Sequence, residues 1–273
     1  MPELPEVETV VKTLRKLILN KEIEKVNVYW DNIIAYPELS NFKNDVKGQK
    51  IVDINRRGKY ILFNLTSKTL VSHLRMEGKY FVYDEFAEKD KHDHVIFDFK
   101  DDGQLHYNDT RKFGKMYLYD ENEALKILAN VGLEPWDIKL TGTYLKKRAK
   151  NRRVTIKQFL LDQSIIAGIG NIYVNEILFL ARLHPATIVN TISLLKFNEI
   201  VNITQDVLSQ AIEQGGTTIR SYTSSLGVTG LFQQSLKVHN LEGENCEICN
   251  EQIIKITVAQ RGTYLCPNCQ RKK

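Results

Sequence analysis

Residues 158–185 read "QFLLDQSIIAGIGNIYVNEILFLARLHP", and this stretch gives the clearest indication of how the C-terminal half folds. One apolar segment ends, two glycines follow, and a second apolar segment begins at Asn171. Gly168 and Gly170 can adopt positive φ angles, and asparagine is a residue type that caps helices. The stretch therefore predicts two helices within 154–183 that meet at the turn "AGIGN".

This predicted helix pair has two interpretations. Taken by itself, it is an ordinary helical hairpin with a glycine turn. Alternatively, the backbone N–H groups that are free at the start of the second helix bind an anion such as a phosphate. The segment "KKRAKNRR" at 146–153 has six basic residues and no acidic one. Such a run is commonly a solvated surface, but beside a glycine turn it favours contact with nucleic acid.

All four cysteines lie in the last 28 residues, as two Cys-x2-Cys pairs separated by sixteen residues. This spacing predicts one tetrahedral zinc site. Its ligands would be Cys246, Cys249, Cys266 and Cys269. Four thiolates leave no open coordination position, so the zinc ion is predicted to be structural. The segment is too short to bury a core of its own, and the metal would supply its folding energy.

The N-terminal half has a different pattern. Residues 5–19 place apolar side chains on one helical stripe, and Pro5 suits the first helical turn. Between 22 and 118, eight runs of β-branched and aromatic residues alternate with turn residues, which predicts about eight strands in a β-sandwich. Further along, we predict a helix over 192–213 and a mobile segment rich in Gly, Ser and Thr at 215–230.

Together these patterns predict a multidomain α+β protein, with an N-terminal β-sandwich flanked by helices and a C-terminal helical domain that carries a zinc finger. The predicted divisions are a sandwich domain at 1–131, a linker with the basic run at 132–153, a helical domain at 154–230 and a zinc finger at 238–273.

The bulk composition excludes several classes of protein. With 42% hydrophobic and 26% charged residues, the chain is globular rather than disordered. No run of 18 apolar residues is present, so we expect no membrane-spanning helix. The N-terminus lacks the basic and then apolar pattern of a secretory signal. We therefore expect a cytoplasmic protein. Its net charge of +5 is a mild excess that fits an anionic partner.

Motifs spread from residue 2 to residue 269 resemble the bacterial formamidopyrimidine-DNA glycosylase family. They are "PELPEVET" at 2–9, "RRGKY" at 56–60, "SHLRMEGKY" at 72–80, "KHDH" at 91–94, "GIGNIY" at 168–173 and "AQRGT" at 259–263. The resemblance implies a monomeric DNA glycosylase and AP lyase of base excision repair. Its substrate would be double-stranded DNA that contains oxidised purines, 8-oxoguanine or formamidopyrimidines. The helical domain would be a helix–two-turn–helix domain, whose segment 217–230 closes over an everted base.

The resemblance also implies the catalytic residues. Removal of the initiator methionine would expose the secondary amine of Pro2, which would form a Schiff base at the sugar C1′. An α-amine has a pKa near 8, against about 10.4 for lysine, so more of it is neutral at cellular pH. Glu3 would be the acid–base group, and Glu6 would support the site. Lys59 would assist β-elimination, and Arg261 would grip phosphates and assist δ-elimination.

Three residues match the family positions that fill the DNA stack after a base is everted. Phe113 would be an apolar wedge, Arg111 would face the orphaned cytosine, and Met76 would occupy the vacated space. By residue type alone, Met76 and Phe113 would more often be core residues. The family typically reads "DPRRF" here, whereas this chain reads "DTRKF", with Thr110 and Lys112 at the changed positions. The resemblance adds further DNA contacts at His92, Asn171, Arg152 and Lys157.

Two other functions stay open. One is a glycosylase similar to endonuclease VIII, which prefers oxidised pyrimidines. Its N-terminus typically reads "PEGPE" and it typically lacks the three filling residues, so Leu4 and the filling set favour oxidised purines. The other is a non-catalytic zinc-dependent DNA-binding protein on the same scaffold. It would be expected to lose Pro2, Glu3 or Lys59, and this chain has all three.

Overall fold

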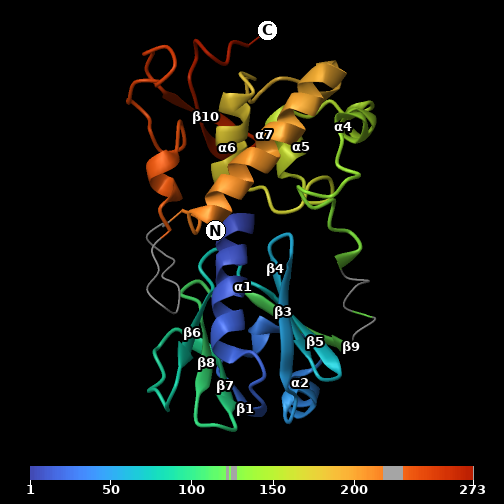
Figure 1. The fold of residues 1–273 in the computed structure, drawn as a ribbon, viewed down its shortest axis with the longest axis vertical. Helices are drawn as coiled ribbons and strands as arrows, with labels where there is room; N and C mark the ends of the chain where they lie inside the picture. Colours follow the sequence, from blue (N-terminus) through green and yellow to red (C-terminus); the bar gives the residue numbers. More distant parts are fainter. Residues whose placement is uncertain (121–122, 124–127, 218–229, 273) are drawn as a thin grey trace. The chain divides into compact units, whose positions relative to one another are not determined.

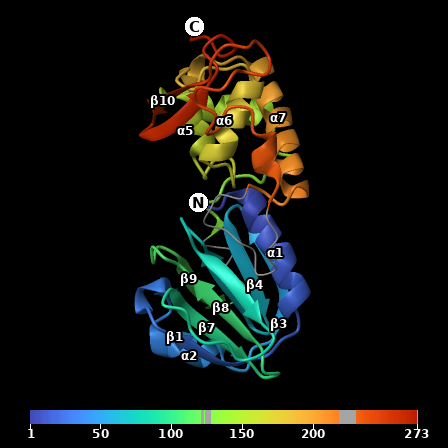
Figure 2. The same ribbon diagram turned by 90° about the vertical axis from the view of Figure 1, so that its left-hand side faces the viewer.

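The computed structural model of the protein divides into two compact units, whose elements are shown in two views in Figure 1 and Figure 2. The structure describes residues 1–120, 123, 128–217 and 230–272. Unit 1 comprises Met1–Asn130 and Gly215–Gly230, and unit 2 comprises Val131–Gln214 and Leu231–Lys273. Of the predicted closing segment 217–230, residues 218–229 lie outside the described residues.

Unit 1 contains two β-sheets. One has four strands in the order β1-β7-β8-β6, and the other has five strands in the order β2-β9-β5-β4-β3. The first sheet consists of β1 (Ile23–Val28), β7 (Asp93–Phe99), β8 (Gln104–Asn108) and β6 (Lys79–Tyr83). The second consists of β2 (Ile34–Tyr36), β9 (Lys115–Asp120), β5 (Lys68–His73), β4 (Tyr60–Leu65) and β3 (Ile51–Arg57). Strands β2 and β9 run parallel, and the other described pairs in this unit are antiparallel.

The two sheets share one apolar core, which confirms the predicted sandwich. Phe97 and Tyr107 of the first sheet belong to the same buried cluster as Phe63 and Met116 of the second. Strands β4 and β9 alternate between buried and half-buried residues along most of their length, as strands with one face on the core do. Burial of one such large side chain contributes roughly 1.5–3 kcal/mol.

Two helices cover the edges of the sandwich (Figure 1). Helix α1 (Leu4–Ile18) contacts β3 and β6, which are the edge strands on one side. Helix α2 (Leu39–Val46) contacts β1 and β2, which are the edge strands on the other side. Exposed strand edges carry unpaired backbone groups, so these helices protect the sheets from pairing with another chain. The predicted stripe of α1 from Val7 to Ile18 is buried, except that Leu17 is half-buried.

Strand β2 and helix α2 were not predicted. With three and eight residues, both are too short to show a clear hydrophobic period. The other eight strands correspond to the eight runs in the sequence.

Unit 2 contains the predicted helix pair, α5 (Ile156–Leu161) and α6 (Asn171–Leu180), followed by α7 (Leu194–Glu213). Gly168 has a φ of +92°, as predicted. Gly170 instead has an extended φ of −129° and is the N-cap of α6, so Asn171 is the first helical residue rather than the cap. In the described part of the chain, no helix is long and apolar enough to cross a membrane.

The predicted linker at 132–153 contains a helix, α4 (Gly142–Ala149), and is therefore not a linker. Helix α4 packs against α7, and its Leu145 and Ala149 are completely buried. Helix α4 was not predicted because it is short and rich in basic residues, so its few apolar residues show no clear helical period in the sequence. The segment belongs to the helical unit. Gly215–Gly230, predicted to end the helical domain, are instead part of unit 1, and the remaining domain divisions stay predictions.

Part of the basic run braces unit 2 internally. Lys146 Nζ donates hydrogen bonds to the carbonyl oxygens of Asn190 at 3.2 Å and Ile192 at 2.6 Å. Arg148 donates to the carbonyl oxygen of Ser164 at 3.1 Å. A phosphate contact stays a prediction for the other basic residues of the run. Lys147, Lys150 and Arg153 are exposed, and Arg152 is half-buried.

Candidate active site

The candidate active site of unit 1 surrounds the amino terminus. Helix α1 begins at Leu4, so Pro2 and Glu3 directly precede its first turn, and both are buried. The charges that act on the amino terminus are those of Glu3, Glu6, Lys59 and Glu77. Charged residues that are far apart in the sequence therefore act together on the amino terminus.

Burial lowers the pKa of the Met1 amino group below its ordinary value of 8.0. The positive charge of Lys59 acts in the same direction, whereas Glu3 and Glu6 raise the pKa. After removal of Met1, the amine of Pro2 would begin the chain one residue further on, at a position that is also buried. A lowered pKa leaves more of an amine neutral, and only the neutral form is a nucleophile.

Glu6 connects the amino-terminal segment to the start of the segment 217–230. Glu3 is the N-cap of α1 and forms a capping box with Glu6, in which the Glu3 N–H donates to Glu6 Oε2 at 2.9 Å. The other oxygen, Glu6 Oε1, accepts hydrogen bonds from the backbone N–H of Thr217 at 2.8 Å and from its hydroxyl at 3.1 Å. This geometry supports the predicted supporting role of Glu6.

Lys59 lies in the turn between β3 and β4 and is only 6% exposed. Sequence reasoning missed Arg56, which braces this turn. Arg56 Nε donates to Glu8 Oε2 at 2.8 Å, and its Nη1 donates to the carbonyl oxygen of Gly58 at 3.0 Å. The arginine thereby ties helix α1 to the turn that carries Lys59.

The predicted filling residues lie in two neighbouring loops of unit 1. Met76 is half-buried in the loop between β5 and β6. Arg111 and Phe113 lie in the loop between β8 and β9, where the Arg111 guanidinium is 4.8 Å from the centre of the Phe113 ring. Phe113 is 49% exposed, which argues against a core role. His92, half-buried just before β7, accepts a hydrogen bond at its carbonyl oxygen from the N–H of Asp109.

In unit 2, the predicted phosphate-binding residues converge on the hairpin of β10 (Ile254–Val258) and β11 (Arg261–Leu265). Ala259 and Gln260 form its turn with φ angles of +54° and +58°. Arg261 follows the turn and is exposed. Asn171 Nδ2 donates to the carbonyl oxygen of Gly262 at 3.1 Å, so this asparagine braces the hairpin from the first turn of α6.

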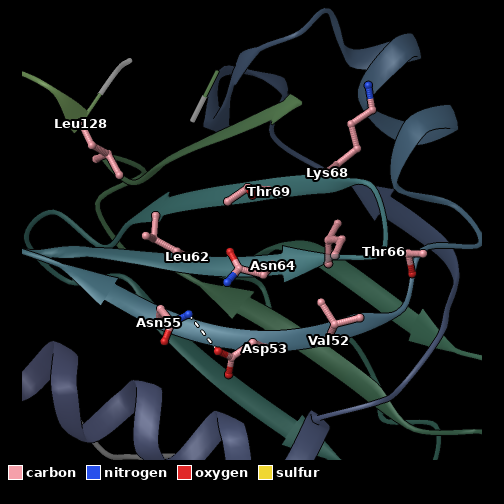
Figure 3. A pocket seen from close by; sticks show the side chains of 10 residues that line it. Val52, Asp53, Asn55, Leu62, Asn64, Thr66, Lys68, Thr69 and Leu128 are labelled. Atoms are coloured by element: carbon pink, nitrogen blue, oxygen red, sulfur yellow. Dashed lines mark hydrogen bonds between the residues drawn. The ribbon is translucent and has the colours of Figure 1, made fainter. Parts of the chain in front are cut away.

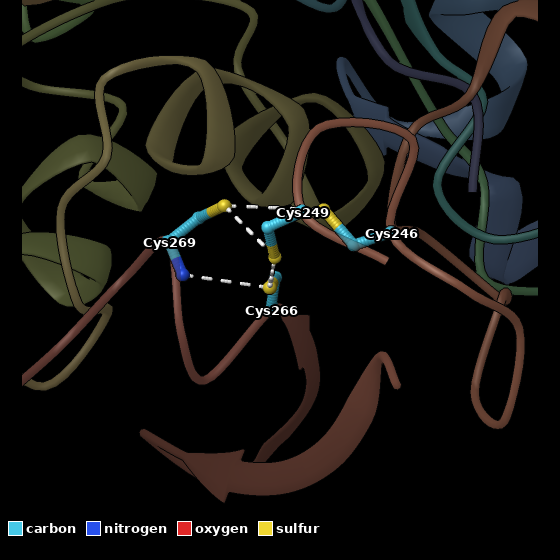
Figure 4. A group of neighbouring side chains, drawn as sticks. All are labelled: Cys246, Cys249, Cys266 and Cys269. Atoms are coloured by element: carbon cyan, nitrogen blue, oxygen red, sulfur yellow. Dashed lines mark hydrogen bonds between the residues drawn. The ribbon is translucent and has the colours of Figure 1, made fainter. Parts of the chain in front are cut away.

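The four cysteine sulfur atoms form a compact cluster (Figure 4). All lie within 4.8 Å of one another, with Sγ–Sγ distances of 3.9 Å for Cys246 and Cys269 and 3.4 Å for Cys249 and Cys266. A tetrahedral zinc ion with Zn–S bonds of about 2.3 Å requires sulfur atoms about 3.8 Å apart. The donor set therefore fits one zinc ion and leaves no open coordination position.

Comparison with known protein families decides the assignment. Residues 1–116 match the formamidopyrimidine-DNA glycosylase N-terminal domain, 131–223 match the H2TH domain of the same enzymes, and 243–271 match the zinc finger found in FPG and IleRS. This chain belongs to the formamidopyrimidine-DNA glycosylase family. Family membership confirms the resemblance seen in the motifs, the α+β fold class and the structural zinc ion.

Individual relatives agree with the family assignment. The formamidopyrimidine-DNA glycosylase of Exiguobacterium sibiricum is 46% identical over 274 residues, which cover 99% of this chain and 99% of that protein. Lactococcus lactis Fpg, solved with DNA containing N7-benzyl-Fapy-dG, has a TM-score of 0.94 at 38% identity and covers 99% of this chain and 100% of its own.

MutM in complex with DNA containing carbocyclic 8-oxo-G has a TM-score of 0.93 at 38% identity, with the same coverage. Like the rest of the formamidopyrimidine-DNA glycosylase family, the chain is a DNA glycosylase, an enzyme of base excision repair that acts on damaged DNA.

Lys157 does not have the position that the resemblance implied. Its side chain is completely buried, and Nζ donates to Asn175 Oδ1 at 3.1 Å, the Gly262 carbonyl oxygen at 3.1 Å and Thr263 Oγ1 at 2.6 Å. The predicted DNA contact is therefore wrong. In this glycosylase, Lys157 joins α5 and α6 to the hairpin that carries Arg261.

A second buried group attaches the zinc finger of this glycosylase to α6. The carboxylate of Glu176 accepts hydrogen bonds from the backbone N–H groups of Lys237 at 2.8 Å, Val238 at 3.1 Å and His239 at 2.8 Å. Burial raises the pKa of Glu176, although the three N–H groups oppose the shift. Sequence reasoning missed Glu176, since only its place inside an apolar helix distinguishes it.

Arg152 has protein partners at the surface. Its Nη1 donates to Asp162 Oδ2 at 2.9 Å, and its guanidinium lies 5.9 Å from the centre of the Phe159 ring. Its DNA contact stays a prediction.

A cavity of about 470 Å³ lies on the face of the five-stranded sheet that points away from the core (Figure 3). Its lining includes Val52, Leu62, Asn64 and Leu128. None of the predicted site residues is among the described residues that line it, so the cavity is separate from the candidate active site.

Replacement of the buried lysine, Lys157→Met, is expected to destabilise unit 2 by about 3 kcal/mol, because three acceptors lose a charged donor. Thermal unfolding measures this change, and a fluorescence titration with abasic-site DNA should show weaker binding through a displaced Arg261. The matched control is Lys147→Met, an exposed lysine of the basic run, whose stability should stay within about 0.5 kcal/mol of the parent. If Lys157→Met left stability unchanged but weakened DNA binding, the predicted direct contact between Lys157 and DNA would be supported after all.

Proposed function

We propose that this glycosylase is bifunctional and removes the oxidised purines 8-oxoguanine and formamidopyrimidines from duplex DNA, then cleaves the strand as an AP lyase. The observation that carries the proposal is the half-buried amino terminus, which precedes the buried Pro2 and interacts electrostatically with Glu3 and Lys59. The damaged purines in the DNA of the two related structures support the substrate class.

The first step of the proposed reaction is nucleophilic substitution at C1′. The neutral amine of Pro2 attacks C1′, the glycosidic C–N bond breaks, and the departing base takes its bonding electrons and a proton. Loss of the amine proton and opening of the sugar ring leave an iminium between the Pro2 nitrogen and C1′. Glu3, buried beside the chain end, would deliver the proton that the O4′ oxygen needs when the ring opens.

Strand cleavage would follow from the iminium. The positive nitrogen acidifies the C2′ hydrogen, and its loss as a proton expels the 3′ phosphate in β-elimination. A second proton loss, at C4′, expels the 5′ phosphate in δ-elimination. Lys59 and Arg261 would bind these phosphates, since lysine and arginine side chains are the usual partners of phosphate oxygens.

Base eversion would precede the chemistry. Phe113 would wedge into the stack, Arg111 would face the opposite cytosine, and Met76 would fill the vacated space. The segment 217–230 would close over the everted base, and Glu6 would fix its beginning through Thr217. Asn171, Arg261 and the exposed part of the basic run would hold the DNA backbone, with His92 and Arg152 as further contacts.

We propose that the enzyme works as a cytoplasmic monomer on chromosomal DNA.

The test compares three duplexes under single-turnover conditions, with 8-oxoguanine, a formamidopyrimidine or an oxidised pyrimidine opposite its normal partner. We expect excision of both purine lesions at least about tenfold faster than the pyrimidine lesion, with β,δ-elimination products and a borohydride-trapped covalent complex. The reverse preference would favour the enzyme similar to endonuclease VIII. Tight binding without excision or trapping would favour a non-catalytic DNA-binding protein.

A further inference from the structure

The loops that carry the filling residues lie side by side because of the sheet topology. The loop 74–78 leads from β5 to β6, and the loop 109–114 leads from β8 to β9. Strand β5 pairs with β9 in one sheet, and β6 pairs with β8 in the other. His73 pairs with Lys115, so both loops leave the five-stranded sheet at the same level and cross to the other sheet.

The loop 109–114 is built around one buried carboxylate. Asp109 has no exposed surface. Its Oδ1 accepts the backbone N–H of Arg111 at 3.0 Å, and its Oδ2 accepts those of Phe113 at 2.9 Å and Gly114 at 2.8 Å. Between them, Lys112 has a left-handed φ of +58°, which is unfavourable for a residue with a side chain. The carboxylate thus holds the backbone on both sides of a strained residue.

The loop 74–78 has a similar internal anchor. Arg75, directly before Met76, has a left-handed φ of +53°. Its backbone N–H donates to His73 Nδ1 at 2.9 Å. Burial lowers the pKa of His73 to about 3, and the charges of Arg75 and Lys59 act in the same direction. The imidazole is therefore neutral at physiological pH, and its Nδ1 is available as an acceptor.

Two further features join the loops to each other. The hydroxyl of Tyr107 lies between Gly78 and Gly114, and a side-chain carbon added at either glycine would overlap it. At the surface, Thr110 Oγ1 donates a hydrogen bond to Glu77 Oε2. Thr110 stands where the family typically has proline, which has no hydroxyl to donate.

We propose that the two loops form one preassembled wedge, in which Asp109 and Thr110 are positioning residues for the side chains that enter DNA. The inference rests on the proposed function, because it assigns a role within base eversion. Strained backbone at Arg75 and Lys112 persists only where the surroundings fix it, and here buried acceptors do so. A wedge held in this way enters the DNA stack without first ordering its loops, which lowers the entropic cost of eversion.

The experiment separates eversion from chemistry by using two substrates. A duplex with 8-oxoguanine opposite cytosine requires the wedge, whereas a single-stranded oligonucleotide with an abasic site has no base pair to open. The first variant is Thr110→Val, which removes only the hydroxyl of an exposed residue, and its matched control is Thr110→Ser. We expect Thr110→Val to be about fivefold slower on the duplex and unchanged on the single strand, with Thr110→Ser near the parent on both.

The second variant is Asp109→Asn, which is expected to lose about 100-fold on the duplex and less than threefold on the single strand. A 2-aminopurine beside the lesion reports whether the loss lies in opening the DNA. Thermal unfolding identifies a misfolded Asp109→Asn protein. In that case the rates of Thr110→Val alone test the proposed wedge.

The proposed wedge would be wrong if both folded variants cleaved the duplex at the rate of the parent protein. It would also be wrong if a variant lost the same factor in rate on the duplex and on the single strand. Failure of the proposed function looks different, because the parent protein itself would then neither cleave nor trap the single strand.

Discussion

Protein that retains Met1 is expected to lose covalent trapping of abasic-site DNA by at least about 10³-fold relative to processed protein. In the unprocessed chain, the nitrogen of Pro2 is an amide whose lone pair is delocalised into the carbonyl group, so it is not a nucleophile. Removal of one residue converts it into a basic secondary amine at the same buried position. Intact mass measured before and after borohydride reduction reports both the processing state and the covalent adduct.

The control for this comparison is non-covalent binding. Retained Met1 adds one residue at the chain end, and affinity for DNA with a reduced abasic site should change less than about fivefold, because phosphate contacts supply most of it. If unprocessed protein traps DNA as fast as processed protein, the nucleophile is a different amine. Lys59, which interacts electrostatically with the chain end, would then be the first candidate.

The same reaction has an expected pH dependence. Burial lowers the pKa of the Met1 amine, and the Pro2 amine of processed protein would begin at the next position, which is buried. Because a protonated amine cannot attack C1′, the trapping rate should rise with pH through a midpoint below the ordinary pKa of an N-terminal proline amine. The negative charges of Glu3 and Glu6 raise the pKa of the Met1 amine, so they limit how far burial lowers it.

Much of this architecture is visible in the sequence because it depends on local patterns. The stripe of α1 from Val7 to Ile18 follows a helical period, and eight of the nine described strands of unit 1 follow runs of β-branched and aromatic residues. The spacing of the two Cys-x2-Cys pairs predicts that the four sulfur atoms cluster around one zinc ion, because this spacing is typical of tetrahedral zinc sites. The charges of the motif residues Glu3 and Lys59 both act on the amino terminus in the structure. Their catalytic roles stay a proposal.

The errors and omissions share a physical cause. A lysine in a sequence looks the same whether it faces water or is enclosed, and Lys157 is enclosed by partners 18, 105 and 106 residues away. Asp109 and Glu176 likewise act on backbone N–H groups, which leave no pattern in side-chain types. Only tertiary contacts reveal such positions.

Replacement of a zinc ligand, Cys249→Ala, is expected to release the zinc ion and to weaken binding to abasic-site DNA by about 10²-fold. Structural zinc contributes about 10–16 kcal/mol to the folding of small zinc domains, and the apolar cluster of this finger is small. Its buried apolar cluster consists of Phe179, Val238 and Ile253 with two of the cysteines, Cys246 and Cys266. Without the metal, the hairpin of β10 and β11 should lose its order, and Arg261 its fixed position.

Unit 1 has its own core, so its fold should survive the loss of zinc. Metal content by mass spectrometry, circular dichroism of the β-sheet and trapping of a single-stranded abasic oligonucleotide separate these effects. The matched control is Ile248→Ala, an exposed neighbour within the same cysteine pair, which should keep the zinc and the affinity. Zinc loss with unchanged affinity for duplex DNA would make the finger dispensable. Phosphate binding would then have to come from the basic residues at 146–153, because the ordered hairpin that positions Arg261 would be lost.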